Sequence, residues 1–148
     1  MEKIVVRAVQ ESDKAFIELA HAEIAGASAQ KEGLAQNWID RDILCETPKA
    51  KVLVATVDER PVGMMLYALN YFAGDGPVVW VSQLYVTKEF RGLRVVRELL
   101  GELRAQNKGT AGIVWATSPA NQRAYRFFEL AGAKPLKEFT LFYKDWKF

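Results

Sequence analysis

Short runs of hydrophobic residues, separated by polar and turn-forming residues, divide the chain into segments with either a strand or a helix pattern. Ile4 to Val9 is rich in β-branched residues and predicts a first strand. Lys51 to Val57 and Val62 to Tyr71 flank an Asp-Glu-Arg-Pro turn and predict a β-hairpin. Val78 to Val86 is almost continuously apolar, which is typical of a central strand covered on both faces.

Two helices are expected between the first strand and the hairpin. Glu11-Ser12-Asp13 offers capping side chains for the first helix, which places Phe16, Leu19 and Ala20 on one face. The second is expected from about Gln30 to Leu44, because apolar residues recur there at helical spacing ahead of Pro48.

Helices and strands alternate in the second half of the chain. The residues Val96, Leu99, Leu100 and Leu103 recur at i, i+3, i+4 and i+7, which predicts a helix packed on a sheet. Ala111 to Thr117 then predicts another buried strand.

The last helix is bounded by end signals. Ser118-Pro119 is an N-cap followed by proline at the first helical position, and Gly132 is suited to the C-terminal end. Phe139 to Trp146 follows as an aromatic-rich final strand. This order predicts an α/β fold in a single domain, residues 1–148, with ligands bound at the C-terminal ends of the strands.

Composition narrows the functional classes. The chain has 148 residues, half of them hydrophobic, and a net charge of +2 from 20 basic and 18 acidic residues. These charges are spread along the chain, which argues against a nucleic-acid partner. No apolar run approaches the roughly 18 residues of a membrane span and the N-terminus has no signal-peptide pattern, so we expect no membrane partner and a cytoplasmic location. The lone Cys45 is interpreted as a buried or inert thiol.

The segment from Leu84 to Val96 carries the most informative chemistry. It reads as a strand, then a basic turn containing Gly92, then the start of a helix. Unpaired backbone N–H groups at a helix N-terminus attract an anion such as a phosphate, and Arg91 and Arg94 can add to that attraction. An ordinary solvated loop with surface arginines fits this segment equally well.

Two motifs give the chain a resemblance to the GNAT N-acetyltransferase superfamily. Leu84 to Leu100 is similar to the main acetyl-coenzyme A motif of that family, a hydrophobic strand, a loop and Arg/Gln-x-x-Gly-x-Gly/Ala at the start of a helix. Asn121 to Ala133 resembles the second motif, Asn-x-x-Ala-x-x-Phe-Tyr-x-x-x-Gly-Phe/Ala. The resemblance extends over residues 4–146 and implies a mixed central sheet of about six to seven strands flanked by about four helices.

The resemblance also implies which residues bind acetyl-CoA. Backbone groups of the strand would hold the acetyl and pantetheine arm, the turn and helix start would hold the pyrophosphate, and the second motif would flank the thiol. These cofactor-binding residues are Leu84, Tyr85, Val86, Arg91, Gly92, Leu93, Arg94, Val95, Val96, Asn121 and Phe128.

Three departures from the family pattern bear on activity. Arg94 and Val96 replace the two later glycines of the first motif, although Arg94 could add a charge-assisted phosphate contact. Phe128 stands where many members have a tyrosine that protonates the leaving thiolate. Ser82 and Gln83 stand where members often have a carboxylate base, and neither takes up a proton at neutral pH.

No catalytic residue is assigned from the sequence. The other titratable candidates are His21 and Glu23 in the first helix and Tyr125 and Tyr143 near the second motif, and none is favoured. A lone histidine is more often a surface or interface residue than a base. No metal site is expected.

Three functions remain open at this point. The first is transfer of an acetyl group from acetyl-CoA to a primary amine by direct attack, which depends mainly on positioning and on backbone amides that polarise the thioester carbonyl. The second is a catalytically impaired GNAT-fold module that binds CoA or a protein partner as a regulator. The third, a different type of nucleotide-binding α/β protein, is disfavoured by the second motif. The amine would be a small molecule or a peptide, and a homodimer is left open.

Overall fold

The computed structural model describes residues 2–25, 37–72, 76–117 and 119–147. These residues fall into two compact units, Met1–Trp115 and Ala116–Phe148, and each is described here by itself. The single domain expected from the sequence stays a prediction.

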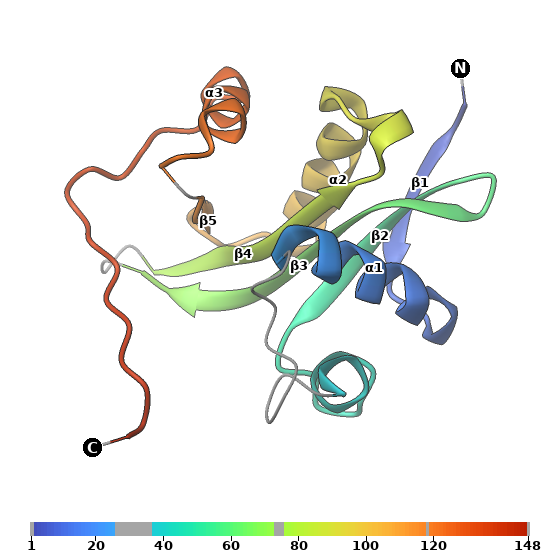
Figure 1. Cartoon of the computed structure of the whole chain (residues 1–148), viewed down its shortest axis with the longest axis horizontal. Helices are drawn as coiled ribbons and strands as arrows, with labels where there is room; N and C mark the ends of the chain where they lie inside the picture. The colour runs from blue at the N-terminus through green and yellow to red at the C-terminus, as the bar shows by residue number, and fades with distance from the viewer. Residues whose placement is uncertain (1, 26–36, 73–75, 118, 148) are drawn as a thin grey trace. The chain divides into compact units, whose positions relative to one another are not determined.

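The first unit is built on a five-stranded mixed sheet with the order β1-β2-β3-β4-β5 (Figure 1). Neighbouring strands from β1 to β4 are antiparallel, and β5 is parallel to β4. The strands are β1 (Ile4–Ala8), β2 (Lys51–Val57), β3 (Arg60–Tyr71), β4 (Pro77–Val86) and β5 (Ile113–Trp115). The expected hairpin is therefore confirmed as β2–β3, and the expected central strand as β4.

Helical segments connect these strands. The α-helices of the first unit are α1 (Lys14–Ala25) and α2 (Leu93–Gln106). It also has two short 3-10 helices, η1 (Glu11–Asp13) and η5 (Lys88–Phe90), and a short π-helix, η4 (Ile39–Ile43). The second unit contains α3 (Gln122–Leu130).

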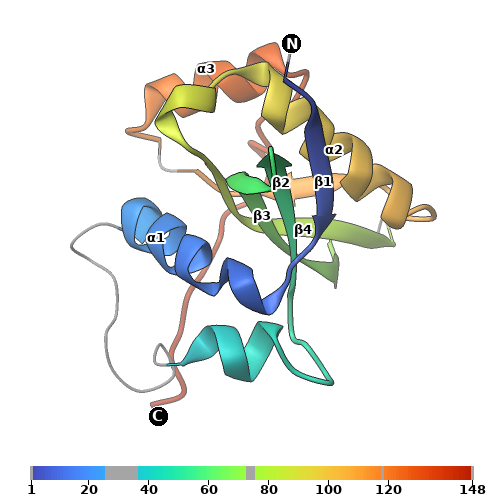
Figure 2. The same cartoon turned by 90° about the vertical axis from the view of Figure 1, so that its right-hand side faces the viewer.

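The core of the first unit lies on both faces of the sheet because alternate strand residues point to opposite sides. On β2, Leu53 and Ala55 join a cluster that also contains Leu99 of α2. Val52 and Val54 join a second cluster that contains Ile17 of α1. α1 and α2 therefore cover opposite faces of the sheet, as Figure 2 shows from the side.

α2 packs very closely on β3 at Gly63. A β-carbon at this glycine would lie 2.8 Å from Cγ1 of Val95 and 3.2 Å from the carbonyl oxygen of Tyr85. Val95 and Val96 are both buried, so the buried stripe of α2 begins one residue earlier than its sequence pattern predicted. Leu100, which was expected to be part of the stripe, is only half-buried.

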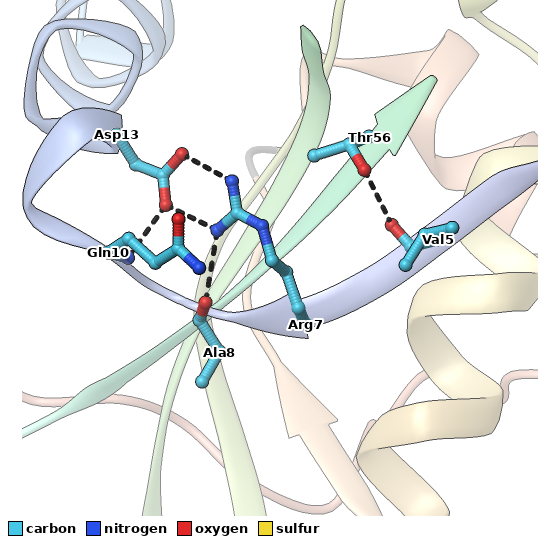
Figure 3. Close-up of polar contacts among 6 residues, drawn as sticks. All are labelled: Val5, Arg7, Ala8, Gln10, Asp13 and Thr56. Carbon is cyan, nitrogen blue, oxygen red and sulfur yellow. Dashed lines mark hydrogen bonds and ion pairs between the residues drawn. The ribbon is translucent and has the colours of Figure 1, made fainter. Parts of the chain in front are cut away.

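A buried ion pair ties the start of α1 to β1 (Figure 3). The Asp13 carboxylate accepts hydrogen bonds from two Arg7 guanidinium nitrogens at 2.7 and 3.0 Å, and from the backbone N–H of Gln10 at 2.7 Å. Burial raises the pKa of the Asp13 carboxyl, but the hydrogen bonds from Arg7 and Gln10 outweigh it, so the pKa lies below its usual value. The pair therefore contributes to stability in its charged form.

Several expectations about elements are corrected. Among the described residues the sheet has five strands rather than six to seven, and β5 is shorter than the expected strand from Ala111 to Thr117. Phe139 to Trp146 forms no strand in the structure. The helix expected from Gln30 to Leu44 lies partly outside the described residues. Its described part is helical over η4, a π-helix from Ile39 to Ile43, so it is confirmed only there. Leu19, expected on the same face as the buried Ala20, is 51% exposed, and Cys45 is exposed rather than buried.

α3 begins later than expected. Its N-cap is Asn121, whose side-chain oxygen accepts a hydrogen bond from the Ala124 N–H at 3.2 Å. The expected cap, Ser118, lies outside the described residues. At the other end Gly132 has a φ of +92°, and the N–H of Ala133 reaches the carbonyl of Phe128, as in a Schellman motif. The expected glycine at the C-terminal end is thus confirmed.

Candidate active site

The second half of β4 has an open edge. β5 pairs with β4 only from Val79 to Val81, where the last partner is Trp115. After Val81, β3 is the only strand that pairs with β4 within the described residues. Backbone N–H and C=O groups alternate between the two sides of a strand, so half of those beyond Val81 face away from β3.

A β-bulge at Ser82 changes which way the following side chains point. Val81 pairs with Tyr67 and Gln83 pairs with Leu66, which leaves Ser82 as an extra residue on β4. Simple alternation would put Gln83 on the same face as Val79 and Val81, which pack with α2. Because of the bulge, Gln83 lies on the α1 face instead.

The loop after β4 leads into α2. Thr87 donates its backbone N–H to the carbonyl of Val62, and η5 then turns the chain. The hydroxyl oxygen of Thr87 is buried and has no hydrogen-bond partner in the part of the chain that the structure describes. Arg91 is exposed, and its Nε donates to the carbonyl of Val86 at 3.2 Å.

The N-terminus of α2 is not capped by a side chain. The N-cap residue is Gly92, whose φ of +139° favours glycine. No side-chain hydrogen bond caps the helix at this position. The next backbone N–H groups, those of Leu93, Arg94 and Val95, are the ones that an α-helix leaves without intrahelical partners. They carry the positive end of the helix dipole.

Arg94 and Val96, which replace the two motif glycines, lie in different environments. The guanidinium of Arg94 donates to the backbone carbonyl of Glu2, ahead of β1. Val96 is only 6% exposed and lies among the buried apolar residues. The side chain of Val96 is therefore part of the core.

Polar side chains from α1 reach β4 beside the open edge. Nδ1 of His21 lies 2.7 Å from Nε2 of Gln83, and the ring of His21 lies 5.2 Å from that of Trp38. The other end of the Gln83 carboxamide, Oε1, is buried and without a hydrogen-bond partner among the described residues. No local sequence pattern could predict this contact, because the two residues are 62 positions apart.

Tyr85 lies two residues after Gln83 on β4 and on the same face of the sheet. Its ring packs edge-on against Phe16 of α1, with centroids 5.8 Å apart. Burial raises the pKa of the Tyr85 phenol, and the hydrogen bond to the carboxylate of Glu23 raises it further. Tyr85 therefore stays a neutral phenol at physiological pH.

The remaining expected site residues belong to the second unit. Asn121 caps α3, and the ring of Phe128 lies edge-on to that of Phe127 with centroids 5.8 Å apart. The two other titratable candidates, Tyr125 and Tyr143, are also in this unit. In the first unit the strand end Leu84–Val86 and the helix start Arg91–Val96 are joined by one short loop, as the sequence order implies.

No group of three or more His, Cys, Asp and Glu side chains among the described residues could hold a metal ion. None of the described helices has the length and apolar character needed to cross a membrane.

Comparison with known proteins decides the family. The sequence model described as the acetyltransferase (GNAT) family matches residues 14–133. The chain belongs to the GNAT acetyltransferase family. The resemblance drawn from the two motifs is thus confirmed. No curated protein sequence matches the chain.

Solved structures share this acetyltransferase fold. The aminoglycoside N-acetyltransferase AAC(6')-Iy, in a complex with CoA, is similar with a TM-score of 0.77 and 15% identity, over 99% of this chain and 97% of that one. A possible acetyltransferase from Clostridium difficile 630 is similar with a TM-score of 0.73 and 18% identity, over 97% of this chain and 99% of that one. A transcriptional regulator from Bacillus halodurans C-125 is similar with a TM-score of 0.75 and 18% identity, over 96% and 100% of the two chains.

Proposed function

We propose that this GNAT family member transfers an acetyl group from acetyl-CoA to a primary amine by direct attack of the amine on the thioester. The observation that carries the proposal is the open edge of β4 beyond Val81, which continues through one short loop into the uncapped N-terminus of α2. A strand edge without a partner strand among the described residues suits an extended chain with amide groups, and an uncapped helix start suits a phosphate.

The residues present fit acetyl-CoA. The backbone groups of Leu84, Tyr85 and Val86 would bind the pantetheine arm and polarise the acetyl carbonyl. The segment Arg91–Val96 would hold the pyrophosphate, with Arg91 supplying charge and the N–H groups of the helix start supplying hydrogen bonds. The unpartnered Thr87 hydroxyl beside this loop supports a polar ligand there. Asn121 and Phe128 would flank the thiol end, as the family motif implies.

The amine would approach from the α1 face of β4. Support for an amine comes from similar structures, because AAC(6')-Iy was crystallised with a bisubstrate analogue of CoA and acetylneamine, and a metagenomic aminoglycoside acetyltransferase with sisomicin. We extend only the chemical class to this chain, a primary amine on a small molecule or a peptide. A cytoplasmic location and a homodimer remain predictions.

Binding and turnover test the proposal separately. Calorimetry with acetyl-CoA and CoA should show binding. Arg91→Leu should weaken it about 10- to 150-fold, since a hydrogen bond to a charged group contributes about 1.5–3 kcal/mol. Arg60→Leu, at an exposed arginine of the β2–β3 turn, is the matched control. No binding heat up to millimolar acetyl-CoA would overturn the proposal.

Turnover is measured as thiol release from acetyl-CoA with four amines, namely sisomicin, spermidine, tyramine and a peptide with a free N-terminus. Release that depends on the amine, with the acetylated amine found by mass spectrometry, is expected for at least one of them. Binding of CoA with no thiol release from any amine would instead favour the alternative function, a regulatory module that has lost catalysis.

A further inference from the structure

The pair of His21 and Gln83 is placed at the part of β4 where the proposed chemistry occurs. Gln83 follows the bulge and lies in the open-edge segment, and His21 reaches it from α1 at 2.7 Å. His21 is the single histidine of the chain and is half-buried, so part of its ring remains accessible. None of the family's proton-transfer positions identified in the sequence has a titratable side chain.

Gln83 can hydrogen-bond to His21 in either protonation state. Its Nε2 can donate to an unprotonated Nδ1, and after a half-turn of the carboxamide its Oε1 can accept from a protonated Nδ1. In both orientations the end of the carboxamide that points away from His21 is buried and has no hydrogen-bond partner among the described residues. In the structure Nε2 of Gln83 faces Nδ1, which fits a neutral ring protonated on Nε2. With the carboxamide half-turned, Oε1 faces Nδ1–H, and Nε2 of the neutral ring is unprotonated and able to take up a proton. General-base catalysis by His21 therefore requires the half-turned orientation.

Trp38 adds a contact that suits a positive charge. Its indole ring lies 5.2 Å from the imidazole ring, and aromatic faces attract cations. The groups that contact His21 from β4 and from the start of η4, Gln83 and Trp38, are both neutral. The titratable groups of the elements around it are Glu18 and Lys14 on α1, Asp40 on η4, and Glu23 with Tyr85, of which Lys14 and Asp40 form an ion pair at 2.5 Å.

We infer that His21 is the general base of the reaction and that Gln83 is its positioning residue. This inference rests on the proposed function. The amine nitrogen forms its bond to the acetyl carbon, the carbon–sulfur bond breaks, and the electron pair leaves on the CoA sulfur. The proton lost by the nitrogen passes to Nε2 of His21, while Nδ1–H donates to Oε1 of Gln83. Solvent then carries the proton from His21 to the thiolate, which balances the reaction.

The tautomer of His21 can be measured without a substrate. Nitrogen NMR of protein labelled in histidine gives the signals of one imidazole, because the chain contains one histidine. The neutral ring should carry its proton on Nδ1 in the wild type, and Gln83→Leu should abolish that preference. A neutral ring protonated on Nε2 in the wild type would overturn the inference, since Nε2 could not then accept a proton.

Kinetics test the role in turnover, with acetyl-CoA and whichever of the four amines wild type acetylates fastest. His21→Ala should lower kcat/KM for the amine at least about 100-fold at neutral pH. Added imidazole should restore part of the loss, and the KM for acetyl-CoA should change less than twofold. Unchanged kcat/KM, or a loss that imidazole does not restore, would overturn the inference.

Gln83→Glu separates positioning from packing. A carboxylate beside the ring stabilises the imidazolium, so the acidic limb of the kcat/KM profile should move to higher pH. Gln106→Glu, at an exposed glutamine at the end of α2, should leave that limb in place. A Gln83→Glu profile that coincides with wild type would overturn the role of Gln83. If wild type releases no thiol with any amine, the proposed function falls, whereas the failures above overturn this inference alone.

Discussion

The two helices that cover the sheet pack on it in different ways. α2 packs through apolar side chains, with Val95, Leu99 and Leu103 buried against β2, β3 and β4. α1 also buries apolar residues, but polar contacts join it to the sheet, from Asp13 just before it to Arg7 and from His21 within it to Gln83. The α2 face of the sheet is therefore an ordinary apolar core. The α1 face combines an apolar core with hydrogen-bonded polar and titratable side chains.

The difference arises in the strand as much as in the helices. A bulge at Ser82 turns Gln83 and Tyr85 toward α1 and leaves the apolar residues Leu84 and Val86 on the α2 face. A bulge costs ladder hydrogen bonds, so it is informative that it lies at the point where β5 stops pairing with β4. We therefore expect mutations on the α2 face to change stability and mutations on the α1 face to change stability, pH dependence and activity in separable ways.

The largest effect is expected on the α2 face. Leu99 is fully buried, so Leu99→Ala should lower the free energy of unfolding by about 2–5 kcal/mol through lost burial and a cavity. Leu19→Ala is the control on α1, because Leu19 is 51% exposed and should change stability by less than about 0.5 kcal/mol. Urea unfolding measures both, and equal losses would contradict the core assigned to α2.

The next effect concerns the ion pair at the start of α1. Asp13→Ala should cost about 2–3 kcal/mol, because it leaves Arg7 and the Gln10 N–H without their buried acceptor. Asp40→Ala removes an exposed ion pair with Lys14 and should cost less than about 1 kcal/mol. A similar cost for the two variants would mean that burial of Asp13 does not matter.

A smaller effect tests the close approach of α2 to β3. Gly63→Ala should cost about 1–3 kcal/mol, since its β-carbon would lie 2.8 Å from Val95. The matched control is Gly101→Ala in α2, where no atom lies within 4 Å of the new β-carbon. That control should stabilise the helix by up to about 1 kcal/mol. Thermal melts of the two variants should shift in opposite directions.

The smallest effect is a pH dependence of stability. The pKa of Asp13 is lower in the folded protein than in the unfolded chain, so its contribution is present at neutral pH. Stability should fall as the pH drops below the unfolded value of about 3.9 toward the folded value. Asp13→Asn should flatten this part of the curve of unfolding free energy against pH. If the free energy of unfolding of Asp13→Asn falls equally steeply at acid pH, the loss of stability comes from other carboxylates.

Much of the fold could be predicted because it depends on local patterns. The hairpin between Lys51 and Tyr71, the helix that contains Leu99 and the glycine end of α3 at Gly132 all follow from the period of apolar residues and from backbone preferences. The prediction of a final strand from Phe139 to Trp146 was wrong, because aromatic and alternating residues favour a strand only when a partner strand pairs with them. The predicted start of α3 was also wrong, because the side chain of Asn121 caps the helix three residues later than expected.

The sequence by itself determined the family, because short continuous motifs with a fixed spacing carry it. The same motifs predict the phosphate-binding segment, which stays a prediction. Only the tertiary structure decided that Gln83 meets His21, that Arg94 turns to the carbonyl of Glu2 and that Val96 is a core residue. A strand pattern does not reveal a bulge, and a one-residue shift moves every later side chain to the other face. The contacts that would carry the chemistry join residues far apart in the chain, so no local pattern could place them together.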